Sequence, residues 1–227
     1  MNASFSRALF QELPIIGILR GFTLEQVTEI VRAALRGGLK NIEITMNTTD
    51  AARQIREAVT VAEGQLNIGA GTVINLELLD QALVAGAAFV VTPTAEPKVI
   101  TACANQKIPV FPGAFSPTEI VRSWDLGAMM VKVFPAESVG PGYIRALKSP
   151  LPHIKLLPTG GVDLMTLPDF LKAGADGFGI GSPLFDRRRV ESCDWTWVEA
   201  QCRAFAEVYQ HALLIQAARQ RGLGNEK

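Results

Sequence analysis

Short apolar segments alternate with longer stretches of helical periodicity along almost the whole chain. The apolar segments are rich in Val, Ile and Leu and are bounded by Gly, Pro, Asn or Thr. Continuous apolar strands of this kind are typical of parallel sheets that are covered on both faces. The sequence predicts strands at residues 14–20, 41–45, 66–71, 88–93, 108–113, 129–135, 154–161 and 177–182.

The stretches between these strands carry the signals of amphipathic helices. In residues 23–38 the apolar side chains recur at three- and four-residue spacing, with Thr23 as candidate N-cap and Gly37 and Gly38 as the stop. The same signals predict helices at 75–87 with Asn75 as the cap, at 116–128 with Ser116, and at 163–175 with Asp163.

Eight strand–helix units within about 200 residues predict an α/β protein built as a (β/α)8 TIM barrel. An open doubly wound sheet is the alternative, but the first strand ends in "LRG" and lacks the Gly-rich dinucleotide turn. No linker or composition shift divides the chain, so we expect a single domain over residues 1–227. A short helix in "SRALFQEL" should cover one end of the fold, and a long final helix is expected at 195–220.

The composition limits the classes of partner. Apolar residues make up 48% and charged residues 19%, which is typical of a globular protein. The 22 Lys and Arg residues balance 22 Asp and Glu residues, which argues against nucleic acid or an anionic membrane as partner. No apolar run is long enough to span a bilayer. The basic run "DRRRV" at 186–190 is the local exception, and it indicates a solvated loop or a rim near a phosphate.

The cysteines and histidines predict neither a disulfide framework nor a metal site. Cys103, Cys193 and Cys202 cannot all pair and lack metal-ligand spacing, so a reduced cytoplasm is expected. The two histidines, His153 and His211, lie far apart in the sequence and are expected at the surface.

Lys132 is the most unusual residue in the predicted strands, within "MMVKVFP". Because side chains alternate across a strand, Lys132 shares a face with Phe134, whereas Val131 and Val133 share the other. The valines suit a helix-covered exterior, which places Lys132 in the mouth of the barrel. Burial lowers the pKa of an ammonium group, and the neutral amine can form a Schiff base with a ketone. The structural alternative is a lysine that reaches solvent or only pairs with Glu43.

Further polar residues lie near the carboxyl ends of the predicted strands, where barrel enzymes build their active sites. Glu43 lies within "NIEIT", and a carboxylate inside a buried strand costs free energy unless it has a partner or a task. Facing Lys132, it could move protons to and from a substrate, or it could act only as an ion-pair partner. The other candidate binding residues at strand ends are Arg20, Thr72, Pro93, Phe134, Thr159, Gly160, Gly161, Gly181 and Ser182.

Two glycine-rich turns predict a phosphate site. The segment "PTGGV" follows the seventh predicted strand, and "GIGS" ends the eighth. Many barrels bind phosphate at this place, where backbone N–H groups and helix N-termini face the anion. Glycine allows the backbone to approach the ligand without a Cβ in between. The alternative is that both segments are tight turns only.

The motifs "ILRG", "IEIT", "GAGTV", "VTP", "VKVFPAE", "PTGGV" and "GIGS" occur in an order and spacing that resemble the 2-keto-3-deoxy-6-phosphogluconate aldolase family. The resemblance spans roughly residues 12–185. It implies a class I aldolase, free of metal and cofactor, that cleaves a phosphorylated keto-deoxy sugar acid to pyruvate and D-glyceraldehyde 3-phosphate. Close relatives act on the 6-phosphogalactonate epimer or on 4-hydroxy-2-oxoglutarate, and family members are commonly homotrimers.

The resemblance also implies residue roles. Lys132 matches the Schiff-base lysine, Glu43 the acid–base glutamate, and Thr72 a contact to the pyruvate moiety. The residues that match the phosphate end are Thr159, Gly160, Gly161, Gly181 and Ser182.

Asn47 departs from the gluconate-type pattern, in which an arginine at this position grips the substrate carboxylate. Galactonate-type members resemble this chain more closely, with Asn here, an arginine in "ILRG" and "GPxYI" after the lysine strand. We therefore expect Arg20 to supply the positive charge, since a guanidinium binds a carboxylate through two hydrogen bonds. The preference for one C4 epimer stays open because "FPAE" is the gluconate-like spelling.

Two other functions fit part of the pattern. A phosphate-binding barrel isomerase or synthase would use the glycine turns but would not need a neutral Lys132. A non-catalytic sugar-phosphate sensor would bind ligand without turnover, and the presence of both Lys132 and Glu43 argues against it.

Overall fold

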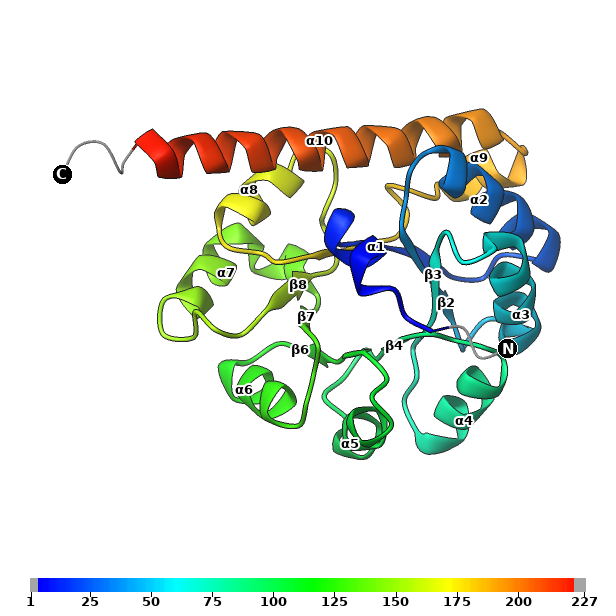
Figure 1. Cartoon of the computed structure of the whole chain (residues 1–227), viewed down its shortest axis with the longest axis horizontal. Helices are drawn as coiled ribbons and strands as arrows, with labels where there is room; N and C mark the ends of the chain where they lie inside the picture. Colours follow the sequence, from blue (N-terminus) through cyan, green and yellow to red (C-terminus); the bar gives the residue numbers. More distant parts are fainter. Residues whose placement is uncertain (1–3, 223–227) are drawn as a thin grey trace.

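Parallel strands and helices alternate along the chain, as the sequence pattern predicts (Figure 1). This computed structural model describes residues 4–222. The strands are β1 (Ile15–Leu19), β2 (Asn41–Thr45), β3 (Asn67–Gly71), β4 (Val90–Val91), β5 (Val110–Phe111), β6 (Gly113–Ala114), β7 (Val131–Val133), β8 (Leu156–Pro158) and β9 (Phe178–Ile180). The helices are α1 (Arg7–Glu12), α2 (Leu24–Arg36), α3 (Ala51–Ala62), α4 (Leu76–Val84), α5 (Pro97–Asn105), α6 (Pro117–Asp125), the 3₁₀ helix η1 (Ala136–Ser138), α7 (Gly140–Lys148), α8 (Leu167–Lys172), α9 (Arg187–Glu191) and α10 (Trp195–Gly222).

The strands pair in two parallel sheets, with the orders β5-β4-β3-β2-β1-β9 and β6-β7-β8. All eight predicted strands are present, and the fifth is divided into β5 and β6 by Pro112, which has no N–H to donate to a ladder. An isolated parallel bridge between Thr159 and Gly179 links the end of β8 to β9. The molecule is therefore an α/β protein with a curled parallel sheet, and Figure 1 shows its helices arranged around the strands.

Three of the four predicted helix caps are confirmed. Thr23 and Ser116 each form a capping box with the residue three positions later, and Asn75 accepts a hydrogen bond from the backbone N–H of Leu78. These caps fix where helices begin after strands, and so they fix where the loops at the strand ends stop.

The fourth cap, Asp163, was wrongly predicted as the start of a helix. The helix α8 begins four residues later, at Leu167, with Thr166 in the N-cap position. Asp163 instead accepts hydrogen bonds from the backbone N–H groups of Met165 and Thr166, at 2.9 and 2.8 Å, and so stabilises a preceding turn. Asp side chains commonly hold such turns as well as helices, and the pattern alone does not separate the two.

Side chains alternate across β7 as the sequence predicts. Val131 and Val133 are buried in the large cluster between the strands and the helices. Met130 belongs to a smaller inner cluster with Phe10, Phe89, Phe111 and other residues. Lys132 points away from the valines and is 6% exposed. The alternation thus puts the ammonium group on the inner side of the curled sheet.

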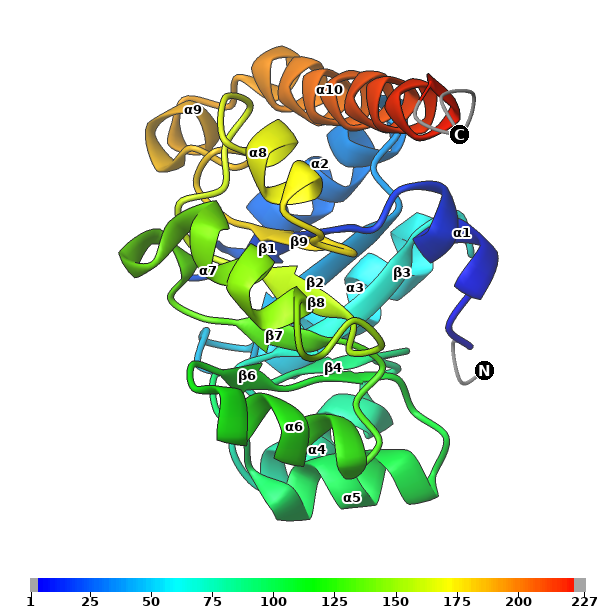
Figure 2. The same cartoon turned by 90° about the vertical axis from the view of Figure 1, so that its left-hand side faces the viewer.

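The first and last helices, α1 and α10, lie at different positions relative to the strands. Near α1, the Asn67 side chain at the start of β3 exchanges hydrogen bonds with the backbone of Ser6, which places α1 at the amino ends of the strands as expected. The final helix, α10, packs against α2 and α8 on the outside (Figures 1 and 2). Neither helix closes the carboxyl ends of the strands, where the candidate site lies.

Candidate active site

Lys132 lies at the centre of the candidate site, on β7. Its neighbours in register are Gly113 on β6 and Leu157 on β8, and its backbone N–H donates to the Pro112 carbonyl at 2.8 Å. Burial lowers the pKa of the ammonium group below its usual range, the positive charge of Arg20 acts in the same direction, and the negative charge of Glu43 opposes both. A larger share of the amine is therefore neutral, which is the form that attacks a carbonyl carbon.

Glu43 lies on β2 and is 2% exposed. Burial raises the pKa of its carboxyl group, while the charges of Lys132 and Arg20 pull it down. One of its oxygens, Oε2, is buried without a hydrogen-bond partner among the described residues. Such an atom costs free energy in a structural role, and it suits a group that exchanges protons with a substrate.

Arg20 and Thr72 come together at the carboxyl ends of β1 and β3. The Arg20 guanidinium donates a long hydrogen bond of 3.4 Å to the Thr72 hydroxyl. Thr72 has a positive φ of 58°, a conformation that non-glycine residues adopt at some cost. Because Arg20 also affects the pKa values of Glu43 and Lys132, its charge lies on the reacting side of the site.

One cavity of about 500 Å³ joins Arg20 and Lys132 to the glycine-rich turns. Gly160 and Gly161 both have positive φ, at 92° and 69°, which favours glycine. The Thr159 hydroxyl is also buried without a hydrogen-bond partner among the described residues. The candidate residues that line the cavity are Arg20, Lys132, Phe134, Thr159, Gly160, Gly161, Gly181 and Ser182.

Four other candidates lie beside or outside this lining. Glu43 sits close enough to Lys132 for their charges to interact, and Thr72 contacts Arg20. Pro93 lies next to Gly113, where an added Cβ would come within 2.3 Å of the Pro93 carbonyl oxygen. Asn47 is exposed and is not part of the cavity lining.

Two charged residues of the cavity were not among the sequence candidates. Glu137, in η1, lies against the glycine turn, and an added Cβ on Gly161 would come within 2.7 Å of its Cβ. Arg187, the first residue of α9, lines the cavity from the loop after β9. The only sequence signal for Arg187 was the run "DRRRV", in which three arginines are equivalent until the start of α9 is known.

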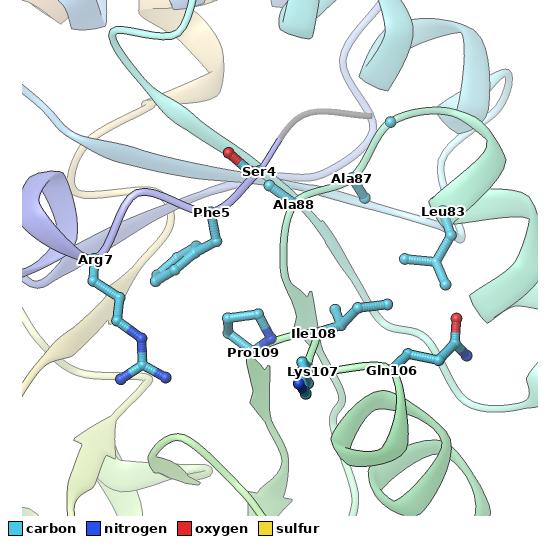
Figure 3. A pocket seen from close by; sticks show the side chains of 11 residues that line it. Ser4, Phe5, Arg7, Leu83, Ala87, Ala88, Gln106, Lys107, Ile108 and Pro109 are labelled. Carbon is cyan, nitrogen blue, oxygen red and sulfur yellow. The ribbon is translucent and has the colours of Figure 1, made fainter. Parts of the chain in front are cut away.

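A second cavity, of about 350 Å³, lies at the opposite, amino ends of the strands (Figure 3). Its charged lining residues are Arg7 and Lys107, and Lys107 is exposed. No carboxylate lines this cavity within the described chain. It therefore lacks the buried amine and the acid–base partner that distinguish the cavity around Lys132.

Within residues 4–222, no group of three or more His, Cys, Asp or Glu side chains is placed to hold a metal ion. In the same part of the chain, no helix has the length and hydropathy that crossing a membrane requires.

A family model described as KDPG and KHG aldolase matches residues 7–201. The chain belongs to this aldolase family. The resemblance inferred from the motifs is thereby confirmed, and the match includes Lys132, Glu43 and both glycine-rich turns.

Members of the KDPG and KHG aldolase family resemble the chain over most of its length. The 2-dehydro-3-deoxy-6-phosphogalactonate aldolase of Escherichia coli K12 is 34% identical over 89% of this chain and 97% of its own length. The 2-dehydro-3-deoxy-phosphogluconate aldolase of Treponema pallidum is 34% identical over 92% of this chain and 94% of its own. A crystal structure of KDPG aldolase from Legionella pneumophila, with pyruvate captured as a covalent carbinolamine, has a TM-score of 0.81 at 26% identity, covering 87% of this chain and 96% of that one.

Proposed function

We propose that the protein is a class I aldolase that cleaves a 2-keto-3-deoxy-6-phospho sugar acid into pyruvate and D-glyceraldehyde 3-phosphate. The observation that carries this proposal is the burial of Lys132 beside Glu43 at the base of a cavity lined by two glycine-rich turns. Relatives that carry the gluconate and the galactonate names support the substrate class, and the pyruvate carbinolamine of the Legionella enzyme supports the covalent mechanism.

The neutral amine of Lys132 begins the reaction. It attacks the C2 ketone of the substrate, and the carbinolamine loses water to give a protonated Schiff base. Glu43 supplies and removes the protons of these steps, for which a carboxyl group of raised pKa is suited. The positive imine nitrogen then serves as the electron sink for carbon–carbon cleavage.

Cleavage follows when Glu43 takes the proton of the C4 hydroxyl. The C3–C4 electron pair moves toward the imine to form an enamine, and glyceraldehyde 3-phosphate leaves as the aldehyde. Protonation of the enamine at C3 and hydrolysis of the imine release pyruvate and restore the free amine. Arg20 holds the substrate carboxylate, Thr72 contacts the pyruvate moiety, and Thr159, Gly160, Gly161, Gly181 and Ser182 form the phosphate end. Pro93 and Phe134 contribute to the walls of the site.

We also propose that the strands close as one eight-stranded (β/α)8 barrel. In this arrangement β5 and β6 are the two parts of one strand on either side of Pro112, and the Thr159–Gly179 bridge joins β8 to β9. We propose that this barrel is the single domain of the chain. The protein is expected to act as a homotrimer in the cytoplasm, and light scattering on the purified protein tests the assembly.

The test is direct cleavage of the two epimeric 6-phospho acids, with pyruvate and glyceraldehyde 3-phosphate measured separately. Lys132→Ala and Lys132→Arg should both abolish cleavage, because a guanidinium is not a nucleophile at neutral pH. The matched control is Lys155→Ala, since Lys155 is exposed and lies outside the cavity around Lys132. Cleavage by either Lys132 variant near the wild-type rate would refute the proposal, whichever epimer is preferred.

4-Hydroxy-2-oxoglutarate is the second candidate substrate, because the matching family model covers aldolases of both names. Cleavage of this compound uses the same Schiff base. An isomerase or synthase of similar fold would form no such adduct, so borohydride reduction in the presence of pyruvate separates that class from both aldolases.

A further inference from the structure

Arg187 is a basic side chain of the cavity that the mechanism above leaves without a role. It begins α9, directly after the loop that follows β9, and it lines the same cavity as Lys132. Among residues 4–222, four charged residues line the cavity: the cations Arg20, Lys132 and Arg187 and the carboxylate of Glu137. Arg20 and Lys132 serve the keto end of the substrate, so Arg187 is the cation that remains for the other end.

The contacts of Arg187 position its guanidinium without occupying it fully. The group donates to the backbone carbonyls of Arg20 at 3.3 Å and Gly21 at 3.4 and 3.5 Å, all longer than a typical N–H···O bond. It lies over the Phe22 ring, 5.3 Å from the centroid. Its ion pair with Glu191, at 3.6 Å between exposed groups, is of the kind that contributes little. An anion in the cavity would therefore compete with weak partners only.

Arg20 and Arg187 serve different sides of the loop that follows β1. The sheet order places β9, β1, β2 and β3 side by side. Arg187 reaches the backbone of Arg20 from the β9 side, whereas the Arg20 guanidinium extends to Thr72 after β3. The glycine turns follow β8 and β9, so Arg187 lies on their side of the cavity and Arg20 on the opposite side.

The carboxylate of Glu137 favours a cation at the phosphate end. An added Cβ on Gly160 would lie 3.7 Å from the carboxylate carbon and one oxygen of Glu137, so this negative charge lies beside the turn. Without a side-chain cation, backbone N–H groups would have to hold a phosphate dianion against this repulsion. A guanidinium facing the same space offsets it and can donate two parallel hydrogen bonds to a phosphate.

We propose that Arg187 binds the terminal phosphate of the substrate and makes the enzyme select phosphorylated over unphosphorylated keto-deoxy acids. On binding, the guanidinium exchanges its long contacts to the Arg20 and Gly21 carbonyls for shorter bonds to phosphate oxygens. The proposal rests on the proposed aldolase function for its substrate. It adds a particular side-chain cation to the phosphate site that the sequence predicted at the two glycine-rich turns.

Arg187→Ala tests the proposal, with Arg188→Ala as the matched control. Arg188 has the same charge, lies on the same helix and is exposed outside the cavity around Lys132. We expect Arg187→Ala to raise the KM for the 6-phospho acid roughly ten- to a hundredfold, the effect of losing a charged hydrogen bond. The kcat/KM for the same acid without phosphate should stay within about twofold, and Arg187→Lys should restore part of the loss.

Calorimetric binding of inorganic phosphate gives a readout that does not depend on turnover. Arg187→Ala should bind phosphate at least about tenfold more weakly than the wild type and Arg188→Ala. Borohydride trapping of pyruvate, which carries no phosphate, should be equal in all three proteins. If Arg187→Ala binds phosphate as the wild type does, or if Arg188→Ala weakens binding equally, the assignment of Arg187 is wrong. If the wild type traps no pyruvate and yet loses phosphate with Arg187→Ala, the aldolase proposal fails and the phosphate site stands.

Discussion

Gly71 makes room for the carboxylate of Glu43. A Cβ placed on Gly71 would lie 2.6 Å from Glu43 Oε1 and 2.7 Å from its carboxyl carbon, closer than carbon atoms of a real side chain come. The two residues lie on neighbouring strands, β3 and β2, and Glu43 is in register with Gly69. The position of the proposed acid–base group therefore depends on a missing side chain on the adjacent strand.

Gly71→Ala should lower turnover by roughly 10²-fold, because displacement of a catalytic group by about 1 Å has that effect. The free energy of unfolding should also fall by about 1–3 kcal/mol, the usual result of overpacking. Gly142→Ala is the control, since an added Cβ there would meet no atom of the described residues within 4 Å beyond its chain neighbours and its own helix backbone. Steady-state kinetics and thermal unfolding check both effects. Full activity in Gly71→Ala would show that the position of Glu43 does not limit the reaction.

Glu43→Gln should slow cleavage by roughly 10²–10⁴-fold, the range for a positioned acid–base group. The fold and the binding of phosphate should survive, because Gln keeps the shape of the side chain. Circular dichroism and phosphate calorimetry provide these controls. A variant with unchanged turnover and a lower melting temperature would make Glu43 a structural partner of Lys132 instead.

The same substitution should change the pH dependence of pyruvate trapping. The negative charge of Glu43 raises the pKa of Lys132, so removing it lowers that pKa further. The neutral amine then persists to lower pH, and the acid limb of the trapping rate in Glu43→Gln should move to lower pH. A shift toward higher pH would contradict the charge interaction between Glu43 and Lys132.

Arg20→Ala should weaken the binding of pyruvate and of the full substrate by roughly ten- to a hundredfold, if Arg20 holds the carboxylate. Because the charge of Arg20 lowers the pKa of Lys132, the acid limb of trapping should move to higher pH. Asn47→Arg in this background should restore part of the binding. Unchanged pyruvate trapping together with weakened binding of glyceraldehyde 3-phosphate would assign Arg20 to the phosphate.

Treatment with EDTA should leave cleavage unchanged. His153 and His211 are exposed and far apart in the sequence, and the described part of the chain holds no cluster of metal-ligating side chains. The measurement is the cleavage rate before and after dialysis against the chelator. Lost activity that zinc or manganese restores would refute a metal-free reaction.

The sequence was most informative where local rules decide the structure. Strand alternation alone placed Lys132 opposite Val131 and Val133, because the valines had to face the covering helices. The caps at Thr23 and Ser116 also followed from local hydrogen bonding. These rules need only a few neighbouring residues, so they can be applied before the fold is known.

Other features depend on packing between distant segments. The run of three arginines gave no reason to choose Arg187. The choice depends on where α9 begins and on the position of its first residue beside the backbone of Arg20 at the end of β1. The contact between Glu137 and the glycine turn also joins segments that are separated in the sequence. The pairing of the fifth strand with β7 agrees with the predicted order, but its division at Pro112, with β5 beside β4 and β6 beside β7, was not predicted.

The proposed reaction depends on a Schiff base between Lys132 and the keto substrate. Its most direct test is borohydride reduction of the wild-type protein in the presence of pyruvate, followed by intact-mass analysis and peptide mapping. We expect one reduced pyruvyl group per chain, carried by the peptide that contains Lys132, and no such adduct in Lys132→Ala. The absence of an adduct in the wild type, or an adduct on another lysine, would contradict it.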